Sequence, residues 1–270
     1  MRSVSFSVLL LLMACSRPEP VNRGSVFAGQ GATVATPKEV PLTADAPALS
    51  GPCAAGTPAS DVALLDDFED NDAKPFKAFQ REGWWFTAAD PTEGGKLSPA
   101  NGQFMPTRLP ANEASKTNLF AMHVQASGQT DWGITAGTTL RWVKEGVRCP
   151  LNVSAFQGIK FRAKGPGTLQ FKVDVPGTMP PDGGGVCSKG CYDSPGKLIM
   201  LSDHWDDYLV TWDRLQQGGW GTEVRFDPAR VLGIEFSVGV KLLPADFWLD
   251  DIEFVPKSPP PVAAAQATKG

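Results

Sequence analysis

Acidic residues near the two ends of the central region have the type and spacing of a calcium site. Asp67 and Glu69 are two residues apart, so an extended strand would project both carboxylates to one side. Asp251 lies in a second apolar segment and would add a third carboxylate if the two segments are neighbours. Calcium takes about six to eight oxygen ligands. We predict a calcium ion held by Glu69 and Asp251, with Asp67 next; the alternative is that these acids line solvent or bind turn amides.

Aromatic residues outside the strand pattern are the candidates for ligand contact. The chain has eight Trp and two Tyr. Sugar rings pack their C–H groups on aromatic faces, while amides and acids bind the hydroxyls. Trp132 follows an aspartate and precedes a glycine, Tyr192 follows Cys191, and Trp220 stands between two glycines. We predict that these three aromatic residues contact a ligand.

One histidine is a fourth candidate. His123 alternates with Met122 and Val124, so it projects away from an apolar strand face. With Gln125 and Lys172 it would line a polar face that binds a ligand. An ordinary solvated surface explains these three polar residues equally well.

Besides Cys15 the chain has four cysteines, and in an exported chain they predict two disulfides. They permit three pairings, and the sequence leaves the choice open. The short segment from Cys187 to Cys191 contains a glycine and can close on itself, which would pair Cys53 with Cys149. Zinc is disfavoured because the chain has only two histidines.

The first residues predict export. Arg2 is followed by an apolar run at residues 8–12 and by Leu-Met-Ala-Cys ending at Cys15. The run is roughly half of the about 20 residues that a spanning helix needs. The segment resembles a bacterial lipobox, which implies a signal peptide at residues 1–14 and a lipid on Cys15. We predict a lipid anchor in the cell envelope, in the outer membrane because Ser16 is not Asp. The alternative is an ordinary secretory signal cut elsewhere.

Composition predicts an all-β domain between two low-complexity segments. Twenty-eight Gly and 24 Pro indicate many turns between short strands. Residues 15–60 are rich in Pro, Ala and Gly and predict a disordered tether; residues 61–256 predict the folded domain, and 257–270 a disordered tail. The net charge of −4 and the absence of a basic patch argue against nucleic acid as a partner.

Alternating apolar residues predict the strands. Residues 159–163 and 169–173 alternate on either side of a Gly-Pro-Gly turn and predict a hairpin with one solvated face. Further strands are expected at 120–125, 207–212, 234–238 and 247–255. Four aromatic residues on apolar positions are assigned to the interior: Phe161, Phe171, Trp212 and Phe236.

Five segments resemble galactose-binding-like jelly rolls, above all carbohydrate-binding modules of family 11. They are residues 64–70, 156–165, 204–208, 215–221 and 247–252. The resemblance implies a β-sandwich jelly roll, a structural calcium that joins the strand ends, and polysaccharide or oligosaccharide binding.

The function that we predict is non-catalytic carbohydrate binding by a membrane-tethered lipoprotein. A structural lipoprotein that binds a protein of the envelope is the alternative. A polysaccharide-degrading enzyme is a weaker one, because the chain has no nucleophile elbow, zinc-protease motif or phosphate-binding loop.

Overall fold

The computed structural model describes residues 53–54, 59–78, 80–143 and 146–257. The predicted signal peptide, Cys15, most of the predicted tether and nearly all of the predicted tail lie outside the described residues. Within the described part of the chain, no helix is long and apolar enough to cross a membrane.

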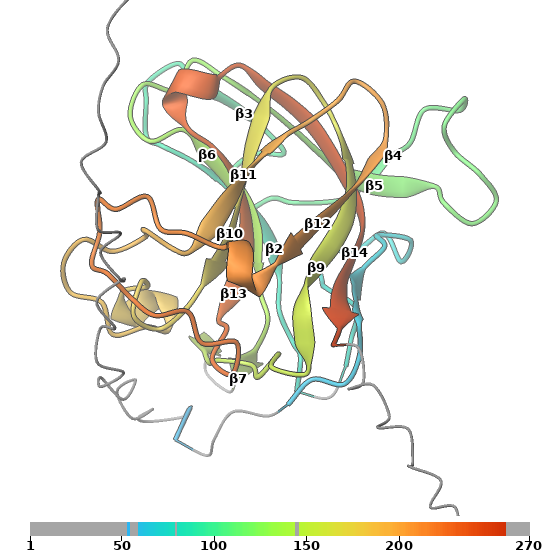
Figure 1. Cartoon of the computed structure of the whole chain (residues 1–270). Helices are drawn as coiled ribbons and strands as arrows, with labels where there is room; N and C mark the ends of the chain where they lie inside the picture. Colours follow the sequence, from blue (N-terminus) through green and yellow to red (C-terminus); the bar gives the residue numbers. More distant parts are fainter. Residues whose placement is uncertain (1–52, 55–58, 79, 144–145, 258–270) are drawn as a thin grey trace, which may run out of the picture. The chain divides into compact units, whose positions relative to one another are not determined.

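Two antiparallel sheets face each other (Figure 1). The larger sheet runs, in spatial order, β12 (Asp206–Thr211), β9 (Phe156–Lys164), β14 (Ala245–Pro256), β5 (Phe120–Ser127) and β3 (Lys96–Ser98), with β1 (Leu64–Asp66) beside β14 and β4 (Thr107–Arg108) beside β5. The smaller sheet runs β11 (Gly196–Met200), β10 (Thr168–Asp174), β13 (Gly233–Val238), β6 (Ile134–Thr139) and β2 (Trp85–Ala89). This arrangement confirms the predicted all-β jelly-roll sandwich.

Short elements complete the described chain. They are the β7 (Trp142–Val143) and β8 (Val147–Arg148) ribbon and the 3-10 turns η3 (Pro181–Gly183), η4 (Trp212–Arg214) and η5 (Val240–Leu242). The turn η3 lies in the loop between β10 and β11, which also contains Tyr192.

The predicted hairpin at residues 159–173 is wrong. β9 pairs with β12 and β14, whereas β10 pairs with β11 and β13, so the turn between them carries the chain from one sheet to the other. The apolar faces of both strands therefore meet in the core, where the rings of Phe161 and Phe171 lie 6.1 Å apart. Alternation alone shows which residues are buried, but not whether consecutive strands share a sheet.

The predicted interior aromatic residues are largely confirmed. Phe161, Phe171 and Phe236 are at most 1% exposed. Trp212 is only partly buried, because the strand ends before it and η4 begins there; its indole donates a hydrogen bond to the carbonyl of Phe156.

Both disulfides are present in the structure. Cys53 bonds Cys149 across 96 positions, and Cys187 bonds Cys191 within one loop. The long-range bond fastens the segment that precedes β1 to the chain just after β8. The short one closes the loop between β10 and β11.

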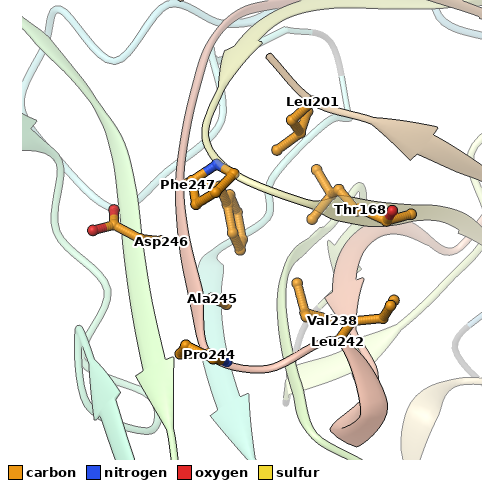
Figure 2. Close-up of a pocket in the computed structure, with 10 residues that line it drawn as sticks. Thr168, Leu201, Val238, Leu242, Pro244, Ala245, Asp246 and Phe247 are labelled. Atoms are coloured by element: carbon orange, nitrogen blue, oxygen red, sulfur yellow. The ribbon is translucent and has the colours of Figure 1, made fainter. Parts of the chain in front are cut away.

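The gap between the sheets near the β9–β10 turn is too small for a sugar (Figure 2). Its volume is about 10 Å³, roughly the room of one water molecule. Leu201, Val238 and Phe247 fill it with apolar atoms, while the Asp246 carboxylate points away from it. A ligand at this end would have to bind an outer sheet face or a loop.

Candidate functional site

Two interlocked loops present Tyr192 and Trp220. Tyr192 lies in the loop between β10 and β11, and Trp220 in the loop between η4 and β13; Figure 1 shows these yellow and orange loops on one side of the domain. The backbone N–H of Thr222 donates to the carbonyl of Gly190 at 3.0 Å, and its hydroxyl donates to the carbonyl of Lys189 at 2.6 Å. The disulfide loop and the Trp220 loop therefore form one unit.

The carboxylate of Asp193 anchors the Trp220 loop. It accepts the backbone N–H groups of Gly218, Gly219, Trp220 and Gly221 at 2.8 to 3.1 Å. Asp193 is 3% exposed, whereas the Trp220 side chain is 65% exposed. A Cβ at Gly221 would lie 2.4 Å from the Cβ of Asp193, so the close approach requires glycine. Asp193 thus fixes the loop backbone that presents the exposed indole to solvent.

Tyr192 is held in a similar way. Its φ of 72° is unusual for a residue with a side chain, and its N–H donates to the carbonyl of Thr178 at 2.7 Å. The disulfide ends at the preceding residue, and the tyrosine ring is 53% exposed. Partial burial and the nearby carboxylates of Asp182 and Glu235 raise the pKa of its hydroxyl.

A carboxyl pair lies beside this loop on the outer side of the smaller sheet. Asp174 and Glu235 are hydrogen-bonded to each other, and Ser194 donates its hydroxyl to Asp174 at 2.6 Å. Burial and then the charge of Asp174 raise the pKa of Glu235 to about 8, and burial also raises the pKa of Asp174. Both shifts favour the protonated form of these carboxyl groups. This carboxyl pair was not predicted from the sequence, because no local pattern indicates a pairing between β10 and β13.

Polar side chains continue along the outer side of this sheet. Lys172 stands opposite Glu235, and Ser237 stands opposite both Gln170 and Thr135. The hydroxyl of Ser237 donates to that of Thr135 at 3.0 Å. We call these five residues the five-strand face. Gln170, Lys172 and Glu235 are partly exposed, whereas Ser237 and Thr135 are at most 9% exposed.

Trp132 lies at the opposite end of the five-strand face. The carboxylate of Asp90 accepts the N–H groups of Asp131 and Gly133 at 3.0 and 2.9 Å, and the indole between them is 46% exposed. Although desolvation opposes it, hydrogen bonds from Thr92 and from these amides lower the pKa of Asp90 to about 2. β6 begins just after this turn and ends beside the start of β13, so Trp132 lies one strand length, about 20 Å, from the Tyr192 end.

His123 lies on the other sheet, apart from the three aromatic candidates. Its ring stacks on Trp248 with centroids 3.8 Å apart, and its Nε2 is 2.8 Å from the Asp246 carboxylate. Gln125 also donates to Asp246, at 2.8 Å. Lys172 belongs to β10 of the smaller sheet, so the predicted face shared by His123, Gln125 and Lys172 is wrong. Both sheets have a polar outer side, and alternation does not distinguish them.

The three predicted calcium ligands do not converge. Glu69 accepts the N–H groups of Leu119 and Phe120, Asp251 is 3.3 Å from the guanidinium of Arg162, and Asp67 accepts the N–H of Glu69. The chain turns directly after β1, so Asp67 and Glu69 are not on a strand. Among the described residues, no group of three or more His, Cys, Asp or Glu side chains has the arrangement of a metal site.

A polar pair, Asn118 and Asp250, lies next in sequence or in space to the amides that bind Glu69. Asn118 precedes the amides that bind Glu69, and its Nδ2 donates to the Asp250 carboxylate at 2.9 Å. The Oδ1 of Asn118 is buried without a hydrogen-bond partner, and burial raises the pKa of Asp250 to about 7. A buried carbonyl oxygen without a donor and a carboxylate that burial disfavours both fit a hard cation. The calcium stays a prediction, and Glu69, Asn118 and Asp250 fit it better than the predicted set.

Comparisons with known proteins give a likeness at the level of fold. No family model and no curated protein matches the chain. A family 11 carbohydrate-binding module of the cellulosomal cellulase Lic26A-Cel5E of Clostridium thermocellum is similar, with 17% identity over 74% of this chain and 96% of that one and a TM-score of 0.44. The family 11 module from Clostridium thermocellum in complex with a beta-1,3-1,4-mixed-linked tetrasaccharide has 19% identity over 73% and 98% and a TM-score of 0.43.

A family 30 carbohydrate-binding module of the Clostridium thermocellum cellulase Cel9D-Cel44B is also similar. It has 16% identity over 70% of this chain and 99% of that one, with a TM-score of 0.42. Because all these TM-scores are below 0.5, the assignment of the jelly roll rests on the strand order and not on these neighbours.

Proposed function

We propose that this domain binds carbohydrate, without catalysis, on the five-strand face. One observation carries the proposal: carboxylate-anchored turns hold exposed aromatic rings at both ends of a polar sheet face. Trp220 and Tyr192 lie at one end and Trp132 at the other. Rings that are already fixed in solvent lose little conformational entropy when a sugar stacks on them.

The floor between these rings suits a ligand with many hydroxyls. A hydroxyl both donates and accepts hydrogen bonds, and the floor offers the ammonium of Lys172 and the amide of Gln170. One solved neighbour of similar fold is described in complex with a beta-1,3-1,4-mixed-linked tetrasaccharide. Mixed-linkage β-glucan is therefore the first polysaccharide to try.

The carboxyl pair does not support glycoside hydrolysis. Retaining and inverting glycosidases need two carboxyl groups about 5 Å or more apart with the sugar between them. The carboxyl groups of Asp174 and Glu235 are within hydrogen-bond distance of each other, so no substrate atom fits between them.

A polysaccharide-binding assay with matched variants tests this function. The full chain is incubated with insoluble glucan, xylan, mannan and peptidoglycan, and retention is compared for Trp220→Ala, Tyr192→Ala and Trp132→Ala. Phe76→Ala is the control, because Phe76 is 44% exposed and its backbone N–H donates to the carbonyl of Leu65 in β1 of the larger sheet. We expect at least tenfold weaker retention for the Trp220 and Tyr192 variants. The control should be retained as strongly as the parent chain. Retention that is unchanged in all three variants would refute the proposed face.

Protein binding is the second candidate function. Leu198 and Met200 on the edge strand β11 are 62% and 80% exposed. Exposed apolar side chains on an open strand edge favour pairing with another protein. If the chain binds no polysaccharide, this edge is where we expect an envelope protein to bind.

The place of action that we propose is the bacterial cell envelope. The lipobox-like segment ending at Cys15 supports lipid attachment and export, and the two disulfides are compatible with an oxidising compartment. An outer-membrane anchor follows from Ser16, as in the sequence prediction. The domain would then present its sugar-binding face outside the membrane.

We also propose a structural calcium ion beside the middle of β14, where the pairing register shifts after Asp250. Glu69, Asn118 and Asp250 would hold it, and its charge would keep the buried Asp250 ionised. The ion would join the turn after β1 to β14 and to the start of β5. Its role is stability, with no part in ligand chemistry.

A further inference from the structure

A hollow opens on the outer side of the larger sheet, away from the five-strand face. It encloses about 270 Å³, near the lower limit of the roughly 300–1,000 Å³ of small-molecule sites. Its walls come from β1, β9, β12 and β14: Leu64, Lys160, Phe161, Arg162, Asp207, Asp251 and Glu253. Of these residues only Asp251 is a site residue predicted from the sequence, and that prediction was of a calcium ligand.

The hollow is lined by charges of both signs. Lys160 is 2.6 Å from Glu253, and Arg162 makes a single 3.3 Å contact with Asp251. Asp207 stands opposite Arg162 on the neighbouring strand and adds a third carboxylate. Two cations beside three carboxylates give donors and acceptors without the strong positive field that a phosphate or sulfate would need. A neutral ligand with many hydroxyls fits this wall best.

Trp205 lies next to Arg162, one of the residues that line the hollow. The guanidinium of Arg162 lies 5.3 Å from its ring centre, and its indole N–H donates to Glu113 at 2.8 Å. Lys164 lies 5.2 Å from the same ring and also binds Glu113. The indole is therefore fixed from several sides.

The aromatic surface continues across the sheet. Lys164 lies 5.3 Å from the ring centre of Trp248, and His123 stacks on that ring. Lys164, Trp248 and His123 are direct neighbours on β9, β14 and β5, so the row spans about 10 Å. A path of aromatic and polar groups thus leads from the hollow across the strands.

From this geometry we infer that the outer side of the larger sheet is a second carbohydrate site, so that one domain binds two sugar chains. The hollow binds one end of a neutral oligosaccharide, and the row from Trp205 to His123 binds its continuation. The inference rests on the proposed function, because it assigns the same ligand class to a separate face. Two sites on opposite sheets let the domain hold a polysaccharide with avidity or bridge two chains.

Affinity electrophoresis of the full chain tests the second site. The gels contain mixed-linkage β-glucan, xylan, glucomannan or galactan, and three changes are compared: Arg162→Gln/Asp207→Ala, Tyr192→Ala/Trp220→Ala, and all four together. Asp213→Ala is the control, since its side chain is 74% exposed and lies beyond the end of β12. Asp207→Ala alone removes an exposed side chain and tests the hollow if the double variant unfolds.

We expect each double variant to be retained at least tenfold less strongly than the parent chain, with some retention left. The quadruple variant should not be retained. If Arg162→Gln/Asp207→Ala and Asp207→Ala migrate like the parent chain while Tyr192→Ala/Trp220→Ala is not retained, the second site is wrong and the proposed function stands. The reverse pattern overturns the five-strand face and supports the hollow as a site. No retention of the parent chain on any polysaccharide overturns both.

Discussion

The carboxylate of Asp193 accepts the backbone N–H of Trp220 at 3.1 Å, together with three neighbouring N–H groups. A residue of the disulfide loop thus fixes an exposed ring of another loop. The buried carboxylate accepts hydrogen bonds from four backbone N–H groups that would otherwise need water as a partner. The backbone that carries the indole is therefore fixed before any ligand arrives.

Asp193→Ala should loosen the Trp220 loop and weaken sugar binding. Four backbone donors would lose a charged acceptor, and we expect a loss of about 2–4 kcal/mol in unfolding free energy. Hydrogen exchange at residues 218–221 should rise strongly, and polysaccharide retention should fall as far as in Trp220→Ala. The control is Asp182→Ala, an exposed acid of the same loop. Unchanged exchange at the four amides would contradict the anchoring role.

The two disulfides should contribute unequally to stability. Loop-closure entropy grows with the enclosed length, so the bond across 96 positions is expected to stabilise by about 4.7 kcal/mol and the bond across 4 positions by about 2 kcal/mol. Denaturant unfolding of Cys53→Ser/Cys149→Ser and Cys187→Ser/Cys191→Ser measures the two contributions. Equal losses would show that native-state contacts, and not chain entropy, dominate at these bonds.

The fold was more predictable than the site. Alternation located β5, β9, β10, β13 and β14, because each has one face in the core. It did not place β9 and β10 in different sheets, since the pattern on one strand does not identify its partner. The carboxyl pair of Asp174 and Glu235 was missed for the same reason: its members are 61 residues apart in sequence and meet only through sheet pairing.

The candidate aromatic residues show where local reasoning works. Glycine neighbours and a position outside the strand pattern identified Trp132 and Trp220, both of which are exposed in the structure. The anchoring residues Asp90 and Asp193 carried no such signal, because an aspartate that binds amides elsewhere in the fold looks like any loop acid. The predicted calcium ligands do not converge in the structure, because the prediction extended the strand past Asp66, where the chain turns.

Cys15→Ala should release the chain from the membrane fraction. The predicted lipid is attached through the Cys15 sulfur, and without it the apolar run at residues 8–12 is too short to hold the chain in a bilayer. Fractionation of cells that express the parent chain and the variant is the measurement. Cosedimentation of the variant with membranes would contradict the lipoprotein proposal.

Stability without calcium should fall as pH rises from about 4 to about 8. Burial raises the pKa of Asp66 and Asp250 from 3.8 to about 7, and that of Glu235 from 4.5 to about 8. These carboxyls bind more protons folded than unfolded within that window, so the unfolding free energy decreases with pH there, by at most about 1.4 kcal/mol per pH unit for each group. Melting temperatures measured with chelator from pH 4 to 9 test the sign.

Glu235→Gln separates this effect from general charge repulsion. The variant cannot ionise, so its melting temperature should depend less on pH between about 4.5 and 8 than that of the parent chain. Glu82→Gln changes an exposed glutamate and should leave the slope as it is. A parent chain that gains stability with pH across this window would contradict the assignment of buried, protonated carboxyls.

Calcium should remove part of this pH dependence. A cation held by Glu69, Asn118 and Asp250 binds the ionised form of Asp250, so it stabilises the fold most at pH values above about 7 and must compete with a proton below that. We expect millimolar calcium to raise the melting temperature by several degrees at pH 7.5 and by less at pH 5, and chelator to reverse the increase. Differential scanning fluorimetry measures both.

Three substitutions distinguish the two possible ligand sets for calcium. Asn118→Ala and Asp250→Asn should abolish the calcium-dependent rise, whereas Asp251→Asn should retain it, because Asp251 faces Arg162 in the structure. Isothermal titration with calcium gives the affinity directly and separates loss of the ion from loss of stability. A rise that survives Asp250→Asn but disappears with Asp251→Asn would restore the set predicted from the sequence. A melting temperature that responds to neither calcium nor chelator would show that the buried oxygen of Asn118 has some other partner, such as a water molecule.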